Sequence, residues 1–588
     1  MLTERSGDLK RLARVAALVA TVICAGSACS IVPTGGTPEL VREVNRGDPL
    51  LQPFTRLIPT PPRDDWSAEQ VVAGFQAAMA SNDDENRAVA RQYLTPEAAR
   101  VWRPENGVSV VAEADFETPP ISEEAREARI HATTAKRGTI DDDGRYRAAK
   151  GASDWAVTLV RAGNTWRIAA LPDGLLLTEA DVRRAYRPVN LYFLDQMGKG
   201  LVVDQVRLPV TPTGDFVKSV IQRLLQGPSG SLKGAVISDL PEGVRVNSVT
   251  TEGDIVVVDL SAEVQGDDPL FAQLQWTLHD LAKDWTIELR VNGERVGMRI
   301  RPNQSANFDQ LMNPGAGIDA FYLHNGALTM LGSDNSSTPV SGPAGQETLR
   351  PGHKGPTYTE PALSIDPEPM VAAKSSAGGI WVTSSAESGR WQQWITGADL
   401  TAPSWDRYSA LWAVERVGKT TSHVIRHDGG RPRRVAAPGL LNTKVKFFQV
   451  ARDGVRVAAV VEDAGGVHVR LGAIVGRGSD MRVDHLQTLT DAVKDEGEEV
   501  LHIAWKDSTT LLVLLKTKAG KRLDAYSVGD GSREPLKSDE RLRTIAALGD
   551  RMLAGTEKKG EILKFDSARS EWTTVIKEGA AYPIFPLG

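Results

Sequence analysis

The chain has 588 residues, a formal net charge of −6 at pH 7 and only two cysteines. A chain of this length favours several domains over one, and the small net charge gives no basic surface of the kind that binds nucleic acid. Both cysteines, Cys24 and Cys29, lie near the N-terminus, so the rest of the chain must be stabilised by its hydrophobic cores without disulfides.

Residues 1–28 have the pattern of a bacterial export signal. Basic residues precede an uncharged run from Val15 to Ile23, and small residues then lead up to Cys29. The run is too short for a transmembrane helix, which needs about 20 apolar residues. The segment Gly26-Ser-Ala-Cys29 resembles the lipobox of bacterial lipoproteins, in which the cysteine is acylated and becomes the N-terminus, although leucine is more usual than Gly26. We therefore predict that Cys29 carries a lipid; the alternative is an ordinary secretory signal with an incidental Cys29.

Residues 29–65 are expected to form a stalk. This segment contains seven prolines, from Pro33 to Pro62. Proline-rich chains are extended and semi-rigid, at about 3.1 Å per residue. With a lipid on Cys29, the stalk would hold the following domains at the extracytoplasmic face of the cell membrane.

An α+β domain is expected over residues 66–185. Ser67 is a suitable N-cap for a first helix, and Thr95 precedes a proline that begins a later one. Residues 155–161 and 166–170 alternate in polarity and predict a β-hairpin. Helices followed by antiparallel strands indicate an α+β fold. The arrangement resembles the small NTF2-like domains.

A second α+β domain is expected over residues 186–300. The predicted order is two strands, a helix that ends at a Gly-Pro pair, two strands, a helix and a strand. Three segments, Leu225-Gln-Gly-Pro228, residues 240–249 and Val258-Asp-Leu-Ser261, resemble the GerMN module, which is named after a spore-germination lipoprotein. The resemblance implies a GerMN-like domain.

Residues 315–588 contain a repeat in which an aspartate in a turn precedes an apolar strand. The aspartates are Asp366, Asp406, Asp453, Asp507 and Asp550, 40 to 54 residues apart. A propeller blade of four strands takes about 40–45 residues, so we predict one all-β propeller, with a β-sandwich as the alternative. Each aspartate is expected to cap backbone N–H groups in a turn between an outer and an inner strand.

Closure of the propeller predicts where the two ends of this region lie. Early and late strands must lie together, because closure hides the edges of the sheets. The C-terminal strands, including Glu571–Ile576, should therefore lie in or beside the blade that holds Phe321 and residues 327–331.

The histidines and serines of the chain predict no catalytic or metal site. His423 and His427 lie in a predicted strand, where four residues span about 13 Å, too far for two ligands of one metal. Residues 227–231 lack the second glycine of a nucleophile elbow. We therefore expect no catalytic residues, no metal and no cofactor, and no ligand-binding residue is assigned.

Acidic and aromatic motifs also favour structural roles. Residues 141–144, Asp-Asp-Asp-Gly, lack the glutamate of an EF-hand calcium loop and are interpreted as a solvated loop. The acidic segment 495–499 is interpreted as an exposed insertion between blades. Trp405, Trp412 and Trp505 lie at repeat positions and are interpreted as packing between blades; the alternative is a ligand platform.

The order of signal, stalk, two α+β domains and propeller resembles that of the actinobacterial lipoprotein LpqB family. The resemblance is carried by Gly26-Ser-Ala-Cys29, Tyr93-Leu-Thr-Pro-Glu-Ala98, Asn190-Leu-Tyr-Phe193, Leu225-Gln-Gly-Pro228, Gln275-Trp-Thr-Leu278 and Ala402-Pro-Ser-Trp405. It implies a non-enzymatic accessory lipoprotein that acts on the extracytoplasmic domain of the Mtr sensor histidine kinase, and so on cell-envelope homeostasis and cell division. Only Cys29 has an implied residue-level role.

Two other classes of function stay open. One is a protein that binds a cell-wall glycan or peptide through the GerMN-like domain or the propeller. The other is an enzyme that uses the central face of the propeller. An enzyme would need several His, Asp or Glu residues at matching blade positions, whereas the repeat supplies one aspartate per blade, in a turn.

Overall fold

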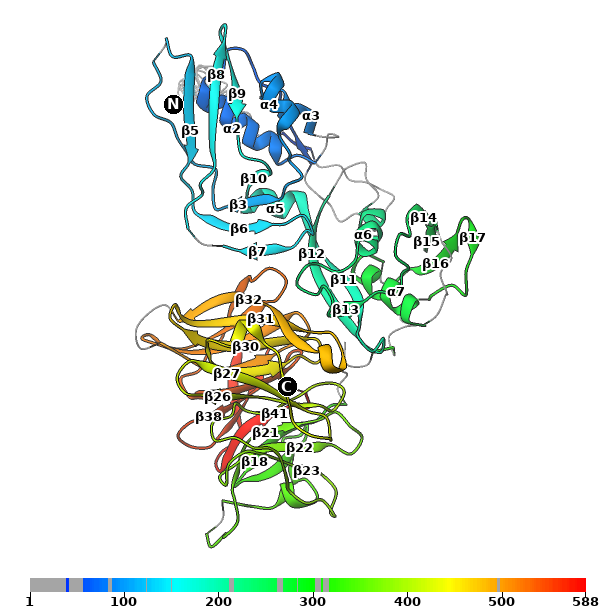
Figure 1. The fold of residues 1–588 in the computed structure, drawn as a ribbon, viewed down its shortest axis with the longest axis vertical. Helices are drawn as coiled ribbons and strands as arrows, with labels where there is room; N and C mark the ends of the chain where they lie inside the picture. Colours follow the sequence, from blue (N-terminus) through cyan, green and yellow to red (C-terminus); the bar gives the residue numbers. More distant parts are fainter. Residues whose placement is uncertain are drawn as a thin grey trace, which may run out of the picture.

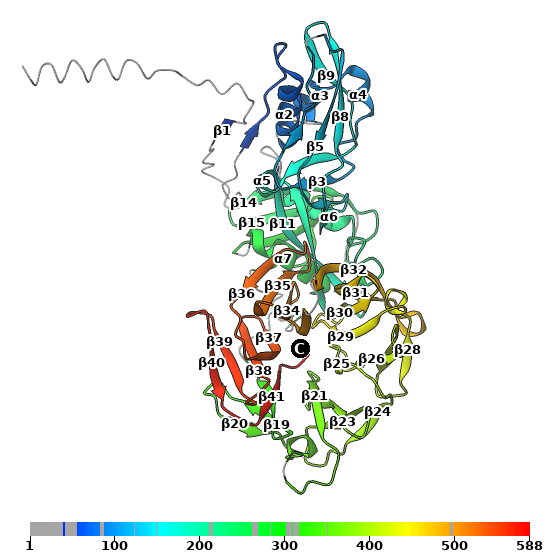
Figure 2. The same cartoon turned by 90° about the vertical axis from the view of Figure 1, so that its left-hand side faces the viewer.

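The computed structural model arranges the described part of the chain as three modules along one long axis (Figures 1 and 2). The structure describes residues 39–41, 56–82, 87–122, 124–149, 151–210, 216–261, 268–282, 284–301, 308–309, 317–349, 351–493 and 498–587. We call the modules the N-terminal module (α2 to α5), the middle module (β11 to β17) and the propeller (β18 to β41).

The N-terminal module is an α+β unit. Its helices are α2 (Ala68–Met79), α3 (Ala88–Arg91), α4 (Pro96–Val101) and α5 (Glu179–Ala185). In its described residues, one sheet has the order β4 (Phe116–Glu117), β5 (Glu127–Ala132), β8 (Ala156–Ala162) and β9 (Thr165–Ala170), and the other β10 (Leu175–Thr178), β3 (Val108–Val111), β6 (Lys136–Ile140) and β7 (Tyr146–Ala148). The mixed fold is confirmed, while the NTF2-like assignment stays a prediction.

Local signals located the elements of this module well. Ser67 forms a capping box with Gln70 at the start of α2, and Thr95 caps α4. The predicted hairpin is β8 paired with β9. One pair of strands differs from the antiparallel arrangement that we expected. β10 and β3 run parallel. These two strands lie far apart in the sequence, so no turn between them indicates how they pair.

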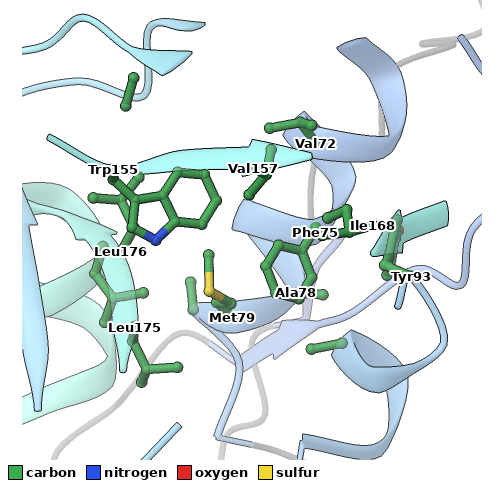
Figure 3. Packing of buried hydrophobic residues seen from close by; sticks show 14 of the residues in the cluster. Val72, Phe75, Ala78, Met79, Tyr93, Trp155, Val157, Ile168, Leu175 and Leu176 are labelled. Atoms are coloured by element: carbon green, nitrogen blue, oxygen red, sulfur yellow. The ribbon is translucent and has the colours of Figure 1, made fainter. Parts of the chain in front are cut away.

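The core of the N-terminal module lies between α2 and the sheets (Figure 3). Phe75 of α2 is fully buried, and its ring centroid lies 6.5 Å from that of Trp155 in a stacked arrangement. The hydroxyl of Tyr93 donates to the backbone carbonyl of Thr60 at 2.5 Å, and burial raises the pKa of Tyr93 to about 12. That bond fastens the end of the expected stalk to this module, and within the same segment β1 (Glu39–Val41) pairs with β2 (Arg56–Ile58).

The middle module holds two helices against two sheets. Its described elements are β11 (Tyr186–Asp195), β12 (Leu201–Pro209), α6 (Phe216–Leu225), β13 (Val236–Ile237), β14 (Val246–Glu252), β15 (Ile255–Leu260), α7 (Asp268–Ala282), β16 (Thr286–Val291) and β17 (Glu294–Arg295). The sheets have the orders β12-β11-β13 and β14-β15-β16-β17. Gly227 ends α6 as predicted: its φ is +88°, and its N–H donates to the carbonyl of Leu224 at 3.0 Å.

The propeller has six four-stranded blades in the part of the chain that the structure describes. Blade 1 is β41 (Ala580–Ile584), β18 (Ala320–His324), β19 (Ala327–Leu331) and β20 (Ser337–Pro339); blade 2 is β21 (Tyr358–Leu363), β22 (Met370–Ser375), β23 (Ile380–Ser384) and β24 (Gln392–Ile395); blade 3 is β25 (Ser404–Trp405), β26 (Leu411–Val417), β27 (Thr421–His427) and β28 (Arg433–Val435). Blade 4 is β29 (Lys444–Val450), β30 (Arg456–Asp463), β31 (Gly466–Val475) and β32 (Arg482–Val493); blade 5 is β33 (Glu499–Trp505), β34 (Thr510–Thr517), β35 (Gly520–Ser527) and β36 (Arg533–Leu536); blade 6 is β37 (Leu542–Leu548), β38 (Arg551–Thr556), β39 (Ile562–Asp566) and β40 (Glu571–Ile576).

The ring closes through the C-terminal strand. β41 pairs antiparallel with β18, and β40 lies in blade 6, next to the blade that β41 completes. Figure 2 shows the closed ring, with the end of the chain at its centre. The propeller and its closure are confirmed, and the β-sandwich alternative is excluded.

The repeat aspartates lie at a different point of the blade from the one predicted. Each follows the first-named strand of its blade, and these first strands contact one another around the centre of the ring. The aspartate turns therefore join the innermost strand to the second strand, not an outer strand to an inner one. The prediction was wrong because a repeat shows which residues are equivalent, but not how far each strand lies from the axis.

The capping role of the aspartates holds for three of the five. Asp406 Oδ1 accepts from the N–H groups of Tyr408 and Ala410, at 2.9 and 3.0 Å. Asp453 and Asp507 accept from backbone N–H groups two residues later in the same way. The other two contact a neighbouring blade: Asp366 accepts from the Ser409 hydroxyl at 2.7 Å, and Asp550 lies 3.1 Å from Lys506 Nζ.

The turn of blade 3 also attaches the propeller to the middle module. Arg407 donates to both carboxylate oxygens of Asp309 at 2.8 Å, and the Asp309 side chain is fully buried. Asp309 accepts in addition from the N–H of Leu201, at the start of β12, at 2.7 Å. The hydroxyl of Tyr408 donates to Asp195 at the end of β11. Burial raises the pKa of Tyr408, so the phenol stays protonated and remains a donor.

The turn of blade 4 and one outer turn add further contacts. Arg456 lies 2.8 Å from its own repeat aspartate, Asp453, and donates to the carbonyl of Val203 in β12. Arg207 of β12 forms an ion pair at 2.6 Å with Asp530, in the turn between β35 and β36. Charged contacts therefore join the middle module to three blades.

The acidic turn 141–144 proves to be a contact between modules. The N–H of Arg207 donates to the carbonyl of Gly144 at 2.7 Å, and Arg223 donates to the carbonyl of Asp143 at 2.9 Å. Gly144 has a φ of +77°, and a Cβ there would lie 2.8 Å from the Arg207 carbonyl oxygen. The interpretation as a solvated loop is therefore wrong for its backbone. The side chains of Asp142 and Asp143 are exposed, but Asp143 Oδ2 also accepts from the N–H of Gly230 in the middle module at 3.2 Å.

Candidate functional site

A cavity of about 490 Å³ lies at the centre of the propeller. All six blades contribute to its wall through residues near the beginnings of their innermost strands. The contacts with the middle module lie at the opposite ends of these strands, where the aspartate turns are. We call the two ends the open end and the docked end. The volume is within the range of about 300–1,000 Å³ that is typical of small-ligand sites.

Two buried residues, Arg452 and Leu587, lie at the docked end of the inner strands. Arg452, which follows β29, donates to the carbonyls of Trp505 and Ala547, at 3.1 and 2.7 Å, where the next two inner strands end. On the other side, Leu587 is buried and its N–H donates to the carbonyl of Leu363 at 3.0 Å. Burial lowers the pKa of Arg452 to about 10, so it is still a cation at neutral pH. These hydrogen bonds link the ends of inner strands from different blades at the docked end.

The wall of the cavity is shaped by irregularities in the innermost strands. The pairing shifts register in the inner strands of blades 1, 2, 4, 5 and 6, and in blade 3 pairing lapses between Thr401 and Ser404. The residues at these points are Glu360-Pro361, Ala402-Pro403, Lys446, Leu501, Arg543 and Tyr582-Pro583, and all of them line the cavity. A β-bulge redirects side chains and is frequent beside functional sites.

Basic side chains occupy one side of the wall. Arg416, Lys446, His502 and Arg543 come from blades 3, 4, 5 and 6 in order around the ring, and we call them the basic arc. Arg416 pairs with Asp399, and Lys446 lies 3.1 Å from Glu462. Arg543 has no carboxylate within 4.0 Å among the described residues.

The facing side of the wall carries fewer uncompensated charges. Glu360 lies 3.2 Å from Lys374 Nζ, both in blade 2. Tyr582 and Pro583 of blade 1 continue this side. Glu557 belongs to blade 6, the blade of Arg543, and lies 3.8 Å from Lys521. The charge of the wall is therefore positive along the basic arc and nearly balanced opposite it.

One neutral polar side chain, His502, lies within the arc, and a second, Gln449, also lines the cavity. Burial, together with repulsion from Arg543, lowers the pKa of His502 to about 4, so its imidazole is neutral at pH 7. The N–H of Ile545 donates to His502 Nδ1 at 3.5 Å, which assigns the ring proton to Nε2. The buried Oε1 of Gln449, a lining residue of blade 4, has no hydrogen-bond partner among the described residues.

Among the described residues singled out in the sequence, Ala402 and Pro403 of the family motif line the cavity, whereas the candidate site residues do not. Cys29 is outside the described residues, as is most of the acidic segment 495–499. His427 of β27 stacks on Trp394 at 4.2 Å between ring centroids. Ser229 donates to Asp204 at 2.9 Å. Neither His427 nor Ser229 lines the cavity.

The tryptophans confirm the packing interpretation. Trp405, Trp412 and Trp505 are each at most 1% exposed. The indole of Trp405 donates to the carbonyl of Ala362 in the neighbouring blade at 3.2 Å, and that of Trp412 donates to its repeat aspartate, Asp406, at 2.8 Å. The described residues contain no group of three or more metal-ligating side chains, nor a helix long and apolar enough to cross a membrane.

The sequence analysis did not predict the basic arc, although the sequence does contain one signal for the cavity. Three of the six inner strands carry proline immediately after the irregular residue, at Pro361, Pro403 and Pro583. Proline within a predicted strand marks an edge or a bulge. Equivalent prolines in a repeat therefore point to bulged edges at the centre of the ring. The charges of the arc differ from blade to blade and leave no repeated pattern.

Three family models match successive parts of the chain. Residues 61–183 match the N-terminal domain of lipoprotein LpqB, residues 190–297 match the model described as sporulation and spore germination, and residues 326–586 match the lipoprotein LpqB beta-propeller domain.

Relatives named as lipoprotein LpqB match almost the whole chain. Lipoprotein LpqB of Thermobifida fusca is 31% identical, covering 97% of this chain and 99% of that protein. Lipoprotein LpqB of Streptomyces coelicolor is 27% identical, covering 99% of each. Among solved structures, TolB from Acinetobacter baumannii has a TM-score of 0.34 at 13% identity, covering 50% of this chain and 74% of that one.

Proposed function

The chain belongs to the LpqB lipoprotein family, and we propose that it is a non-enzymatic accessory protein, anchored through a lipid on Cys29 at the extracytoplasmic face of the cell membrane. There it acts on the extracytoplasmic domain of the Mtr sensor histidine kinase, and through that partner on cell-envelope homeostasis and cell division. The observation that carries the proposal is the match over almost the whole chain to proteins named as lipoproteins.

The geometry supports a function through contact. Buried and partly buried ion pairs fasten the middle module to the propeller, so both would move with the anchor as one body. The open end of the propeller faces away from these contacts. Confining two proteins to one membrane raises their effective concentration, so a weak contact can still be well occupied. The tether is therefore part of the proposed mechanism.

The test is to release the protein from the membrane. A Cys29→Ala variant exported by a cleavable, non-lipidated signal is brought to wild-type abundance, and phosphorylation of the kinase's response regulator is measured. We expect the kinase-dependent response to be largely lost. Ser30→Ala, which keeps the cysteine and its signal, is the matched control and should behave as wild type. Full signalling by the soluble form would show that tethered contact is not the mechanism.

The lipid itself is checked separately by mass spectrometry of the mature protein. We expect an acylated N-terminal Cys29. An unmodified N-terminus at another residue would remove the anchor from the proposal and support the ordinary secretory signal.

A cell-wall glycan or peptide binder is the second candidate, and the polar cavity at the open end favours it. Retention of the protein on purified cell wall, lost on changing residues of the cavity, would support this candidate over the first. Hydrolysis of wall material at about 1–1,000 per second, the ordinary range for enzymes, would contradict both.

A further inference from the structure

We propose that the central cavity of the propeller binds an acidic peptide segment in extended conformation. Its carboxylates would meet the basic arc, and its backbone would meet the edges of the innermost strands. This goes beyond the proposed function, because it assigns a ligand class to a cavity whatever protein supplies the peptide.

The charge of the wall selects an anion. Three cations line this side of the cavity. Arg416 and Lys446 come from the adjacent blades 3 and 4, and Arg543 comes from blade 6. Arg416 and Lys446 already have carboxylate neighbours, whereas Arg543 has none among the described residues. A charge-assisted hydrogen bond between a guanidinium and a carboxylate is among the stronger polar contacts. Arg543 is therefore the principal anchor for a carboxylate of the ligand.

The inner strands favour a peptide over a small anion. Each first strand stands at the edge of its four-stranded sheet, so its second edge faces the channel. Free strand edges bind extended peptides through main-chain hydrogen bonds. The register shifts in these strands interrupt their regular pairing beside the cavity.

The apolar part of the wall fits the same ligand. Phe447, Tyr582 and the three prolines that follow the irregular residues line the cavity together with the charges. A peptide offers side-chain carbon atoms to these surfaces and carboxylates to the arc, whereas a compact anion such as citrate offers only carboxylates. Peptide and anion can therefore be distinguished by experiment.

The experiment measures binding of fluorescein-labelled hexaglutamate to the full-length protein in detergent by fluorescence anisotropy. Hexaglutamine tests the role of the charges, and unlabelled citrate tests whether a small anion suffices. Arg543→Gln and Lys446→Gln are the test variants. Lys518→Gln is the matched control, because Lys518 is an exposed lysine in the turn between β34 and β35, at the open end, and does not line the cavity.

We expect hexaglutamate to bind at least tenfold more tightly than hexaglutamine and citrate. Arg543→Gln should weaken hexaglutamate binding about tenfold, the effect of losing one charge-assisted contact. Lys446→Gln should weaken it about threefold, since Glu462 already offsets that charge, and Lys518→Gln should stay within twofold of wild type.

Three results would overturn the proposal. The first is no binding of hexaglutamate at millimolar concentration. The second is equal loss of binding in the Lys518 control, which would mean a diffuse charge effect. The third is competition by citrate at the affinity of the peptide, which would mean a small-anion site. Unchanged melting temperatures would show that the variants are folded. The outcome of this experiment does not depend on whether the protein acts on the kinase.

Discussion

The two ends of the propeller are built from the same strands but differ in how their residues are used. At the docked end the same residue type returns in five turns, and in three of them, at Asp406, Asp453 and Asp507, its carboxylate accepts from backbone N–H groups of the turn. At the open end each blade contributes a different residue, among them Glu360, Lys446, Arg543 and Tyr582. The docked end therefore has the same residue type in most blades, whereas the open end has different residue types from blade to blade.

This difference shows where structure and function divide in a repeat protein. A residue that shapes the turn between the first two strands of a blade can recur from blade to blade, as the aspartate does in five of the six blades. A site that recognises one asymmetric ligand needs different groups around the ring, so it cannot recur. We therefore expect that, at neutral pH, substitutions at the docked end change stability and substitutions at the open end change binding.

The largest effect is expected for Arg407→Met at the docked end. The change leaves the buried carboxylates of Asp309 and Asp195 without their guanidinium, and breaking a buried ion pair costs about 3–5 kcal/mol. Thermal unfolding should show the propeller melting earlier and separately from the middle module. The control is Arg569→Met, which removes an exposed pair with Asp566 and should leave the melting curve unchanged. Equal behaviour of the two variants would mean that the junction is not held by Arg407.

A smaller effect is expected for Asp406→Ala, which tests whether the repeat aspartates are equivalent. Asp406 is buried and accepts from two backbone N–H groups and the Trp412 indole. Leaving such donors unpaired should reduce the free energy of unfolding by about 2–3 kcal/mol. Asp550→Ala should have no measurable effect, because that side chain is 88% exposed. Similar losses for both would contradict the division between capping and surface aspartates. Urea unfolding gives both values.

His502→Gln probes the open end through pH. The pKa of His502 is lowered from 6.5 to about 4 in the folded protein, so the unfolded chain binds more protons between these values. The wild type should therefore lose stability as pH falls from about 6.5 to 4. The full shift is reduced by solvent reaching the cavity, and we expect a loss of about 2 kcal/mol. Melting curves recorded from pH 7 to 4 should show a smaller loss of stability for the variant than for the wild type. Identical dependence of the melting temperature on pH in the two proteins would contradict this prediction.

The fold could be predicted from the sequence where local chemistry determines an element. The Ser67 cap, the β8–β9 hairpin and the glycine that ends α6 all appear where expected. Pairings between distant segments, such as β10 with β3, left no local signal. The repeat located five turns in a six-bladed ring, and the structure explains the missing one. The first two strands of blade 1, β41 and β18, come from opposite ends of the propeller, so no turn joins them.

The candidate site was less accessible to sequence analysis than the fold. Its basic arc is formed by residues spread from Arg416 to Arg543 that differ between blades. Arg407, the principal contact at the docked end, is one arginine among many, and Asp309 lies in a connection without regular pattern. Such contacts depend on how the modules meet, and this is not determined by any one segment.

Thermal unfolding of Arg407→Met and Arg543→Gln, each with and without saturating hexaglutamate, tests the division between the two ends most directly. A ligand at about 100 times its Kd stabilises the protein that binds it by about 2.7 kcal/mol. We predict that Arg407→Met melts earlier than wild type but keeps the full shift caused by the peptide. We predict that Arg543→Gln without peptide melts at the same temperature as wild type, and that the increase caused by the peptide is about half as large. A variant that changed both readouts, or the reverse assignment, would contradict the account.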